Sequence, residues 1–333
     1  MDFPASAIFA FNANLDHVKY ADEKDIAAIE EFSPQIGSQM NEAFGYGIQK
    51  EISIDIKAAD FFLSKMKFDR SIVGGQAGNA AQQASALGVK CFLHTNSANE
   101  ELCRKFAFPD KVFLANEKGF VQASSFLSSA APAHHFVFEH SESRTRFIAS
   151  YDPFPMHPED NFCSGITNEL PKIGKAFVGG FHLVKTPDRA RKFIEEIRRW
   201  KEVNTKLQVF AELGEFQSRD VLKVVEKELF PIIDILGLNE VELGTLSYDL
   251  EELPGMVPAV LLHTPSEQMV LPNSKQNAAA LEFARRCASF KAATGKFAAE
   301  SDLVGAGADF IDSPVETVGL GDTFSCAYFM CIP

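Results

Sequence analysis

Short apolar runs and longer amphipathic segments alternate along most of the chain. The apolar runs are rich in β-branched and aromatic residues and are bounded by turn residues, which is typical of buried strands. We predict strands at residues 7–11, 89–94, 175–179, 207–211, 232–236 and 259–263. Helical spacing of apolar residues predicts helices at 77–87, 189–203, 218–229 and 277–294. This alternation predicts a doubly wound α/β fold, in which a mostly parallel sheet has helices on both faces.

Two regions depart from this alternation. Residues 48–56, and a second group at 121–125, 136–139 and 145–150, alternate apolar with polar side chains. That pattern is typical of antiparallel strands with one face in water. We therefore expect a small β-rich lid, made of approximately residues 17–70 and 118–160, over a single α/β core that spans residues 1–333.

Net charge, the N-terminal segment and the cysteines indicate which binding partners and which cellular compartment to expect. The formal net charge of -13 argues against nucleic acid and anionic membrane surfaces, because their binding relies on Lys and Arg. The N-terminal segment lacks the basic region of a signal peptide, and its apolar run is too short to span a bilayer. The six cysteines show no metal-ligand spacing, so we expect reduced thiols in a cytoplasmic protein. The oligomeric state is left open.

The segment TVGLGDT at residues 317–323 precedes an apolar helix start. Its glycines would let the backbone turn sharply and direct the amides of Gly319, Leu320 and Gly321 outward at a helix N-terminus, which favours an anion. Asp322 could then accept a proton from a hydroxyl that attacks a phosphoryl group held by these amides. The alternative is that Asp322 is an ordinary N-cap after a glycine turn.

A second glycine cluster, GGQAGN at residues 74–79, precedes the predicted helix at 77–87. The small residues, Gly75 among them, would let a ligand approach the backbone, and Gln76 and Asn79 offer amides suited to hydroxyl groups. The alternative is a plain loop-to-helix junction in which Asn79 is hydrogen-bonded within the first turn. Two such clusters in one chain favour a substrate site.

Together the two clusters resemble the G-G-x-x-x-N and G-x-G-D signatures of the ribokinase-like carbohydrate kinases. More narrowly, the sequence resembles the ADP-dependent sugar kinases, the glucokinase and 6-phosphofructokinase family. Four segments carry the narrower resemblance: FNANLD at 11–16, RFIASYD at 146–152, GLNEVEL at 237–243 and LLHT at 261–264. The resemblance implies a ribokinase-like fold and a glycolytic transferase that phosphorylates glucose or fructose 6-phosphate from Mg-ADP, with AMP as product.

The resemblance also implies roles for particular residues. Asn12, Asn14 and Asp16 would bind the sugar with the GGQAGN cluster, although an Asx-rich turn is the plain alternative for each. Arg146 would reach from the lid toward the ligands, and a charge on a half-exposed strand is the alternative. His263 and Thr264 would lie in the nucleotide-binding loop.

A magnesium site is implied as well. Asn239 and Glu242 match an N-x-x-E motif that organises Mg²⁺ and its waters, while a capping box would explain the same pair structurally. Glu212 matches the glutamate of an H-x-E element in which Phe210 replaces the histidine. The replacement of this histidine by Phe210 changes a position that helps to set the metal site in the family.

Three alternatives and two details stay open. An ATP-dependent ribokinase-like sugar or nucleoside kinase would share both glycine clusters. A catalytically silent sugar-binding relative fits Phe210 but not an intact Asp322. A nicotinamide oxidoreductase would need a dinucleotide fingerprint that the sequence lacks.

The family's chains are usually longer, so we expect a reduced lid. Glu51 lies where an acidic residue in the family favours unphosphorylated glucose, and no role is assigned to His134 and His135.

Overall fold

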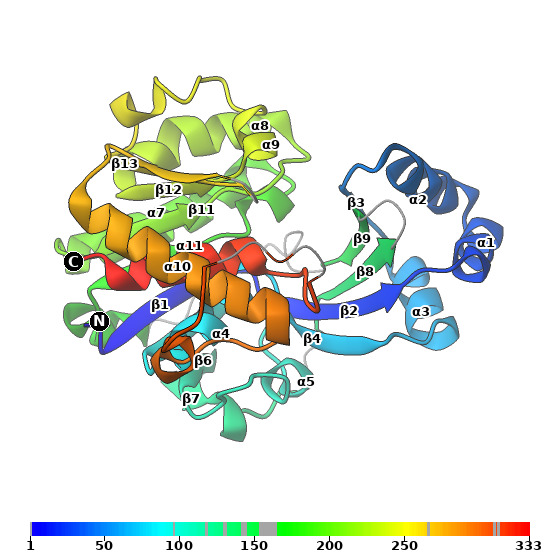
Figure 1. The fold of residues 1–333 in the computed structure, drawn as a ribbon, viewed down its shortest axis with the longest axis horizontal. Helices are drawn as coiled ribbons and strands as arrows, with labels where there is room; N and C mark the ends of the chain where they lie inside the picture. The colour runs from blue at the N-terminus through cyan, green and yellow to red at the C-terminus, as the bar shows by residue number, and fades with distance from the viewer. Residues whose placement is uncertain are drawn as a thin grey trace.

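The protein consists of a large sheet with its helices and a smaller second sheet beside it (Figure 1). The computed structural model describes residues 2–95, 97–116, 119–128, 132–140, 145–152, 165–264, 267–308, 311 and 314–333. Cys163 and the end of the expected lid, residues 153–160, lie outside the described residues. Both chain ends lie on the side of the large sheet that faces away from the second sheet.

The large sheet has nine strands in the order β14-β13-β12-β11-β10-β1-β5-β6-β7. Pairing is parallel from β13 to β6 and antiparallel only at the two edges. The strands are β1 Ser6–Phe11, β5 Lys90–Thr95, β6 Val112–Asn116, β7 Gly119–Gln122, β10 Lys175–Val178, β11 Gln208–Glu212, β12 Ile235–Leu238, β13 Ala259–His263 and β14 Gln268–Leu271. The predicted mostly parallel sheet is therefore confirmed.

Helices cover both faces of this sheet, because successive side chains of its strands point to opposite faces. In β1, Ala7 and Phe9 join the core beneath α4 Gln76–Ala86, α10 Lys275–Thr294 and α11 Leu320–Cys331. Ile8 and Ala10 join the core beneath α7 Pro187–Val203 and α8 Arg219–Val224. Three short helices complete this part: α5 Glu100–Cys103, α6 Ile166–Glu169 and α9 Glu240–Leu243.

The second sheet has five strands in the order β3-β9-β8-β2-β4. Their bounds are β2 Asn14–Tyr20, β3 Lys50–Ser53, β4 Arg70–Gly74, β8 His134–His140 and β9 Thr145–Tyr151. Three helices pack on this sheet over a core of their own: α1 Glu23–Phe32, α2 Pro34–Tyr46 and α3 Ile56–Lys65. In Figure 1 these helices lie at the outer end, away from the large sheet.

One expected strand of the small sheet lies elsewhere. The alternating segment that begins at residue 121 overlaps β7, which pairs with β6 at the edge of the large sheet. An antiparallel edge strand is half-solvated in either sheet, so its alternation does not say which sheet it joins. The remaining segments, as β3, β8 and β9, do meet in the second sheet, which β2 and β4 complete.

Within the described ranges, no helix is both long enough and apolar enough to cross a bilayer. Five cysteines there are free thiols, namely Cys91, Cys103, Cys287, Cys326 and Cys331.

Candidate active site

Two of the points at which the chain crosses between the two sheets are adjacent. β1 ends at Phe11 and β2 begins at Asn14, while β4 ends at Gly74 and α4 begins at Gln76. Between the last pair, Gly75 has a φ of 77°, and a Cβ on it would lie 2.6 Å from Asn14 Oδ1. Glycine is required there by both backbone conformation and space. The two sequence clusters predicted to bind sugar therefore lie side by side.

Asn12 and Gln76 hold these crossings in place. Asn12 Oδ1 accepts a hydrogen bond from the Ala77 amide at 3.3 Å, and Asn12 O accepts one from the Gly78 amide at 3.2 Å. Gln76 Oε1 accepts one from the Gly180 amide, beyond the end of β10, at 2.7 Å. Both side-chain oxygens are therefore engaged by the protein, and each residue can offer a ligand its NH₂ group.

Asp16 is buried on β2 beside Asn14, whose Nδ2 donates to Asp16 Oδ1 at 2.5 Å. A Cβ on Gly74 would lie 2.1 Å from the Asp16 carboxyl, so β4 presses directly against this group. Burial raises the pKa of Asp16 to about 7, with further contributions from Glu51 and Asp322. Asp16 and Asp322, from opposite ends of the sequence, are thus close enough to interact electrostatically.

α11 begins at Leu320, after Gly319 in the left-handed conformation with a φ of 66°. The first N–H groups of a helix have no acceptor within it and lie at its positive end. The amides of Gly319, Leu320, Gly321 and Asp322 therefore have the geometry of an anion site. Asp322 lies in the first turn of the helix, and Gly319 is the N-cap, so the alternative reading of Asp322 as N-cap is wrong.

Asn79 connects the two glycine clusters. Its Nδ2 donates to Asp322 Oδ2 at 3.0 Å, and its Oδ1 accepts from Lys291 Nζ at 3.3 Å. Burial raises the pKa of Asp322 to about 6, Glu212 adds to the rise, and Lys291 and Asn79 oppose it. Because both ends of its amide are used by the protein, Asn79 is placed to orient Asp322.

His263, which is partly exposed, and the buried Glu212 form a pair next to this turn. His263 Nε2 lies 2.7 Å from Glu212 Oε1, and a Cβ on Gly321 would lie 3.1 Å from His263 Cε1. Burial alone would lower the pKa of His263, but Glu212 raises it to about 9, so the ring is protonated at neutral pH. A positive charge therefore lies beside the amides of α11. Thr264 instead closes the turn from β13 to β14, where its Oγ1 accepts from the Glu267 amide at 2.8 Å.

Asn239 and Glu242 form the capping box of α9. Asn239 Oδ1 accepts from the Val241 and Glu242 amides at 2.9 and 3.0 Å, and Glu242 Oε2 accepts from the Asn239 amide at 3.0 Å. Burial, followed by the charge of Glu212, raises the pKa of Glu242 to about 7. The capping box, which was the structural alternative for this motif, is therefore present. Glu242 also lies close to Glu212, and a cation would stabilise these two carboxylates.

A magnesium ion would fit this acidic pair through water. Glu212 Oε2 is buried and accepts no hydrogen bond, which leaves one carboxylate oxygen available. Among the described residues, no three His, Cys, Asp or Glu side chains are arranged to hold a metal directly. Mg²⁺ commonly keeps several waters and takes only one or two protein carboxylates, so these residues suit a largely hydrated ion.

Phe210 is a core residue. It lies two positions before Glu212 on β11, stacks on Phe177 with ring centroids 5.1 Å apart, and contacts Phe329 of α11 at 5.3 Å. Its ring therefore packs β11 against α11 and can supply no metal ligand.

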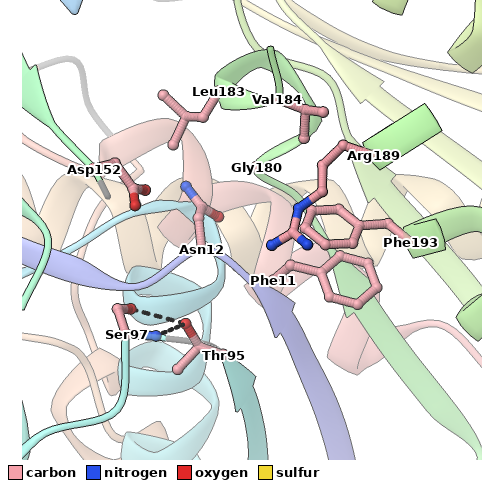
Figure 2. A pocket seen from close by; sticks show the side chains of 10 residues that line it. All are labelled: Phe11, Asn12, Thr95, Ser97, Asp152, Gly180, Leu183, Val184, Arg189 and Phe193. Atoms are coloured by element: carbon pink, nitrogen blue, oxygen red, sulfur yellow. Dashed lines mark hydrogen bonds between the residues drawn. The ribbon is translucent and has the colours of Figure 1, made fainter. Parts of the chain in front are cut away.

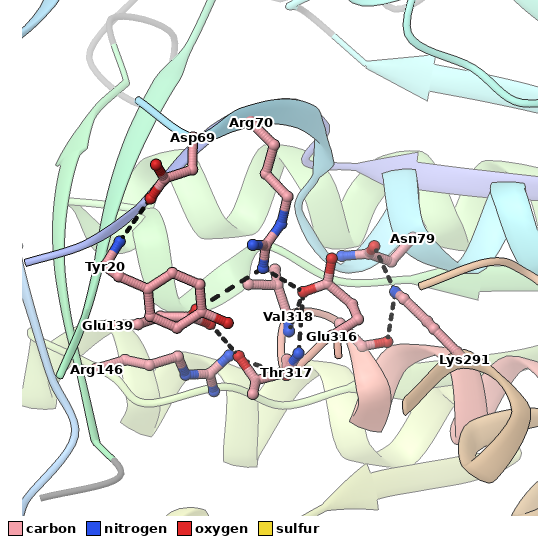
Figure 3. A network of polar contacts seen from close by, with 11 residues as sticks. Tyr20, Asp69, Arg70, Asn79, Glu139, Arg146, Lys291, Glu316, Thr317 and Val318 are labelled. Atoms are coloured by element: carbon pink, nitrogen blue, oxygen red, sulfur yellow. Dashed lines mark hydrogen bonds and ion pairs between the residues drawn. The ribbon is translucent and has the colours of Figure 1, made fainter. Parts of the chain in front are cut away.

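Arg146 takes part in a polar network that joins the second sheet to the segment before α11 (Figure 3). Its Nη1 donates to the Thr317 carbonyl at 3.1 Å, and Arg70 Nη2 lies 3.1 Å from Glu316 Oε1. The same Glu316 oxygen accepts from the Thr317 and Val318 amides, each at 2.9 Å. Thr317 Oγ1 also donates to Glu139 of β8. Because these contacts hold the second sheet to the segment before α11, we call the five residues the clasp: Arg70, Arg146, Glu139, Glu316 and Thr317.

A pocket with an empty volume of about 350 Å³ opens beside the first crossing (Figure 2). Asn12, Asp152 and Gly180 line it, together with the hydroxyl groups of Thr95 and Ser97. Arg189 of α7 also lines it, with its guanidinium carbon 5.4 Å from the Phe193 ring centroid. The pocket therefore combines a guanidinium, a carboxylate, a side-chain amide and two hydroxyl-bearing residues, next to the predicted sugar-binding residues.

Sequence reasoning missed Lys291, Arg189, Glu316 and Arg70. None of them belongs to a motif that the sequence analysis used, although Glu316 directly precedes the segment TVGLGDT. Their importance comes from contacts with residues far away in the sequence, as Arg70 and Glu316 illustrate with a separation of 246.

Comparison with known proteins gives a consistent result. The family model described as "ADP-specific Phosphofructokinase/Glucokinase conserved region" matches residues 6–271. A search of curated protein sequences found no match. Among solved structures, the last common ancestor of ADP-dependent phosphofructokinases from Methanosarcinales is 18% identical, with a TM-score of 0.78 over 98% of this chain and 94% of that one.

Two further solved structures are similar. A hypothetical ADP-dependent phosphofructokinase from Pyrococcus horikoshii OT3 is 18% identical, with a TM-score of 0.77 over 99% of this chain and 98% of that one. An ADP-dependent kinase in complex with fructose-6-phosphate and ADPβS is 17% identical, with a TM-score of 0.83 over 98% of this chain and 93% of that one. The expectation that relatives are longer by an appendage is wrong for these structures, because the matches span nearly the full length of both chains. The reduced lid stays a prediction. The fold is shared throughout.

Proposed function

This chain belongs to the family of ADP-specific phosphofructokinases and glucokinases, and we propose that it transfers the β-phosphoryl group of ADP to a hydroxyl of a hexose or hexose phosphate. The observation that carries this proposal is Asp322, held by Asn79 at 3.0 Å beside the first amides of α11. In the transfer the sugar oxygen bonds to the β-phosphorus, the bond from that phosphorus to the bridging oxygen breaks, and AMP leaves. Asp322 accepts the hydroxyl proton, and the amides of Gly319, Leu320 and Gly321 stabilise the transferring group.

The acceptor binds where the chain crosses between the sheets. Asp16 and Asn14 lie on the second sheet, Asn12 lies between the sheets, and Gly75 is the N-cap of α4, which begins with Gln76 and includes Asn79 in its first turn. A sugar among them has a carboxylate and amides for its hydroxyl groups on one side and Asp322 on the other. The second sheet with its helices acts as a lid, and Arg146 links that lid to Thr317. Closure excludes water, which would otherwise compete as the acceptor.

The nucleotide binds on the other side of the α11 turn, near His263 and Thr264. The protonated His263 adds positive charge beside the amides and suits a phosphate. Glu212, Asn239 and Glu242 would hold Mg²⁺, with its waters, close to these phosphates. When bound, the ion neutralises phosphate charge and polarises the phosphoryl oxygens.

ADP is the expected donor because the matching family is described as ADP-specific. The position of the α11 amides explains how such a site would exclude ATP, since these amides fix the position of the transferred group. A site shaped for ADP holds the adenosine one phosphate nearer to Gly319 than a site shaped for ATP does. In such a site the β-phosphate of ATP would lie at the amides, and its γ-phosphate would collide with the sugar or with Asp322. Clash and charge repulsion of this kind give strong discrimination between donors.

Two observations bear on the acceptor. The pocket beside Asn12 contains Arg189, and a guanidinium there suits the phosphate of a hexose phosphate such as fructose 6-phosphate. Glu51 of β3 favours glucose, since its charge raises the pKa of Asp16, a proposed sugar-binding residue. A negative charge near the acceptor would disfavour a phosphate group on the sugar. Glucose is accordingly the second candidate acceptor.

The test is a panel of ADP and ATP against glucose and fructose 6-phosphate, read by sugar phosphate and AMP formation with adenylate kinase excluded. We expect ADP to support the reaction better than ATP. Asp322→Asn should lower kcat by roughly 10²–10⁴-fold, with the KM for the sugar within a few-fold. ATP equal to or better than ADP would contradict the donor assignment and favour the ATP-dependent alternative. No transfer with any pair would favour the catalytically silent alternative.

A further inference from the structure

Lys291 is a buried cation directly behind the α11 turn. It belongs to α10, is 2% exposed, and lies 4.2 Å from the centroid of the Phe297 ring. Its Nζ donates to Asn79 Oδ1 at 3.3 Å and to the Gly319 carbonyl at 3.2 Å. Figure 3 shows Lys291 and Asn79 facing each other beside the clasp. One ammonium group thus contacts both the residue that binds Asp322 and the N-cap of α11.

This contact determines which way the Asn79 amide points. An ammonium group can only donate hydrogen bonds, so Asn79 must turn its oxygen toward Lys291. Its NH₂ group then faces Asp322, as the 3.0 Å contact requires. Without the ammonium group, the amide could rotate by half a turn and place its oxygen against the Asp322 carboxylate, which would repel it. Lys291 therefore fixes the orientation of Asn79.

Lys291 lies between two helix ends of opposite polarity. It belongs to the last turn of α10, where a cation is favoured, and it contacts the N-cap of α11, where an anion is favoured. Lys175 shows the ordinary arrangement, since it is also buried but donates to the Phe329 and Ile332 carbonyls at the C-terminal end of the same helix. Burial lowers the pKa of both lysines to about 8, and for Lys291 the charges of Asp322, Glu316 and Asp16 oppose that shift.

We infer that Lys291 is a positioning residue for phosphoryl transfer, which orients Asn79 and fixes Gly319 so that Asp322 and the α11 amides face the acceptor. This inference rests on the proposed function. Lys291 touches neither substrate in this arrangement, and it acts through the contacts with Asn79 and Gly319. Its removal should therefore reduce the rate of the chemical step and affect substrate binding little.

The test compares Lys291→Met with Lys175→Met in the full chain. Methionine keeps most of the apolar side chain and removes the ammonium group in both variants. We expect Lys291→Met to lower kcat by about 10²-fold, the usual effect of a small misplacement in the reacting geometry, with the KM for ADP and for the sugar within about threefold. Lys175→Met should lower the Tm while kcat stays within about threefold of the wild-type value.

Rescue provides a second readout that a structural role would not give. Lys291→Ala leaves space for a small cation, so added methylammonium or propylammonium should raise its kcat, whereas Lys175→Ala should not respond. This variant also serves if Lys291→Met does not fold.

Three outcomes would overturn the inference. They are a kcat for Lys291→Met close to the wild-type value, an equal loss of kcat in Lys175→Met, and a folded Lys291→Ala that no amine activates. The wild-type protein is assayed alongside. If it transfers no phosphoryl group at all, the proposed function fails, whereas an active wild type with an active Lys291→Met removes only the role of Lys291.

Discussion

Asp322 is the side chain on which the proposed reaction depends, and its neighbours set its protonation. Burial and Glu212 raise its pKa, while Lys291, Asn79 and His263 lower it, with about 6 as the result. A carboxylate with this pKa is ionised at neutral pH yet more basic than an ordinary aspartate. It can therefore accept a proton more readily at the pH of most cells.

This pKa predicts the acid side of the pH profile. Because the pKa is raised, Asp322 is protonated and inactive as a base below about pH 6, so kcat/KM should fall roughly tenfold per pH unit below that point. The measurement is kcat/KM for the sugar at saturating ADP between about pH 5 and about pH 8.5. A level profile down to the acid limit would exclude Asp322 as the base.

Gly319 is the second residue with a specific requirement. Its φ is 66°, and a Cβ on it would lie 2.4 Å from Asn79 Cγ. Gly319→Ala should therefore displace Asn79 and Asp322 and lower kcat by about 10²-fold. The matched control is Gly45→Ala in α2, where a Cβ meets nothing within 4 Å and kcat should not change. Equal activity of the two variants would show that the turn tolerates the displacement.

At the scale of elements, α9 shows how one short helix can serve two purposes. Asn239 and Glu242 satisfy each other's backbone amides, as the capping-box reading predicts. Glu242 is nevertheless buried beside Glu212, and a capping role does not require that second carboxylate. The arrangement is therefore compatible with both alternatives that the sequence left open.

Glu242→Gln separates these two roles. Glutamine keeps the oxygen that accepts from the Asn239 amide, so the Tm should change little. It removes a negative charge, so the Mg²⁺ concentration for half-maximal rate should rise roughly tenfold. Titration of the rate with Mg²⁺ gives this value, and Glu240→Gln, an exposed position of the same helix, is the control. A large loss of Tm with unchanged Mg²⁺ dependence would favour the structural role alone.

At the scale of the whole molecule, the clasp and a small apolar contact join the second sheet to the turn of α11. Val318, next to the clasp, packs on Val18 and Val137 of the second sheet. Arg70 and Glu139 come from that sheet, while Glu316 and Thr317 directly precede α11. Any movement of the proposed lid would therefore be transmitted to the α11 amides that are proposed to bind the phosphoryl group.

In the arrangement that we call closed, the clasp holds the second sheet to the segment before α11, and loss of Arg70 should weaken it. Arg70→Met leaves Glu316 and Glu139 buried without this guanidinium, which is unfavourable for carboxylates at an interface. If only closed molecules bind both substrates, a smaller closed fraction should raise the KM for ADP and for the sugar, by roughly tenfold. Small-angle scattering should also report a larger radius of gyration with both ligands present.

The control for this variant is Arg104→Met. Arg104 forms an exposed pair with Glu100 on the short helix α5, and such surface pairs contribute little. Its kinetics should match the wild type. Unchanged KM values in Arg70→Met would mean that the clasp does not govern substrate binding.

The sequence by itself determined the elements of the core and the chemistry of its two glycine clusters. Apolar periodicity is a local property, so helices such as α4 and α10 and the strands β1, β5, β10, β11, β12 and β13 could be predicted within a few residues, whereas β6 of the same sheet was missed. The positive φ of Gly75 and Gly319 is local too, since it follows from a backbone turn, whereas the close approach of Asn14 and Asn79 to these glycines depends on the tertiary structure. The family could be predicted because several short motifs occur in one order along the chain.

Only the tertiary structure decided which of these residues meet. Local pattern could not assign β7 to the large sheet, or show that Asn79 faces Asp322 with a sequence separation of 243. It could not single out Lys291 or Arg70 either, because an isolated lysine or arginine usually belongs to a solvated surface. The reason is physical: electrostatic and packing contacts act through space, and folding brings together side chains whose separation along the chain carries no local signal.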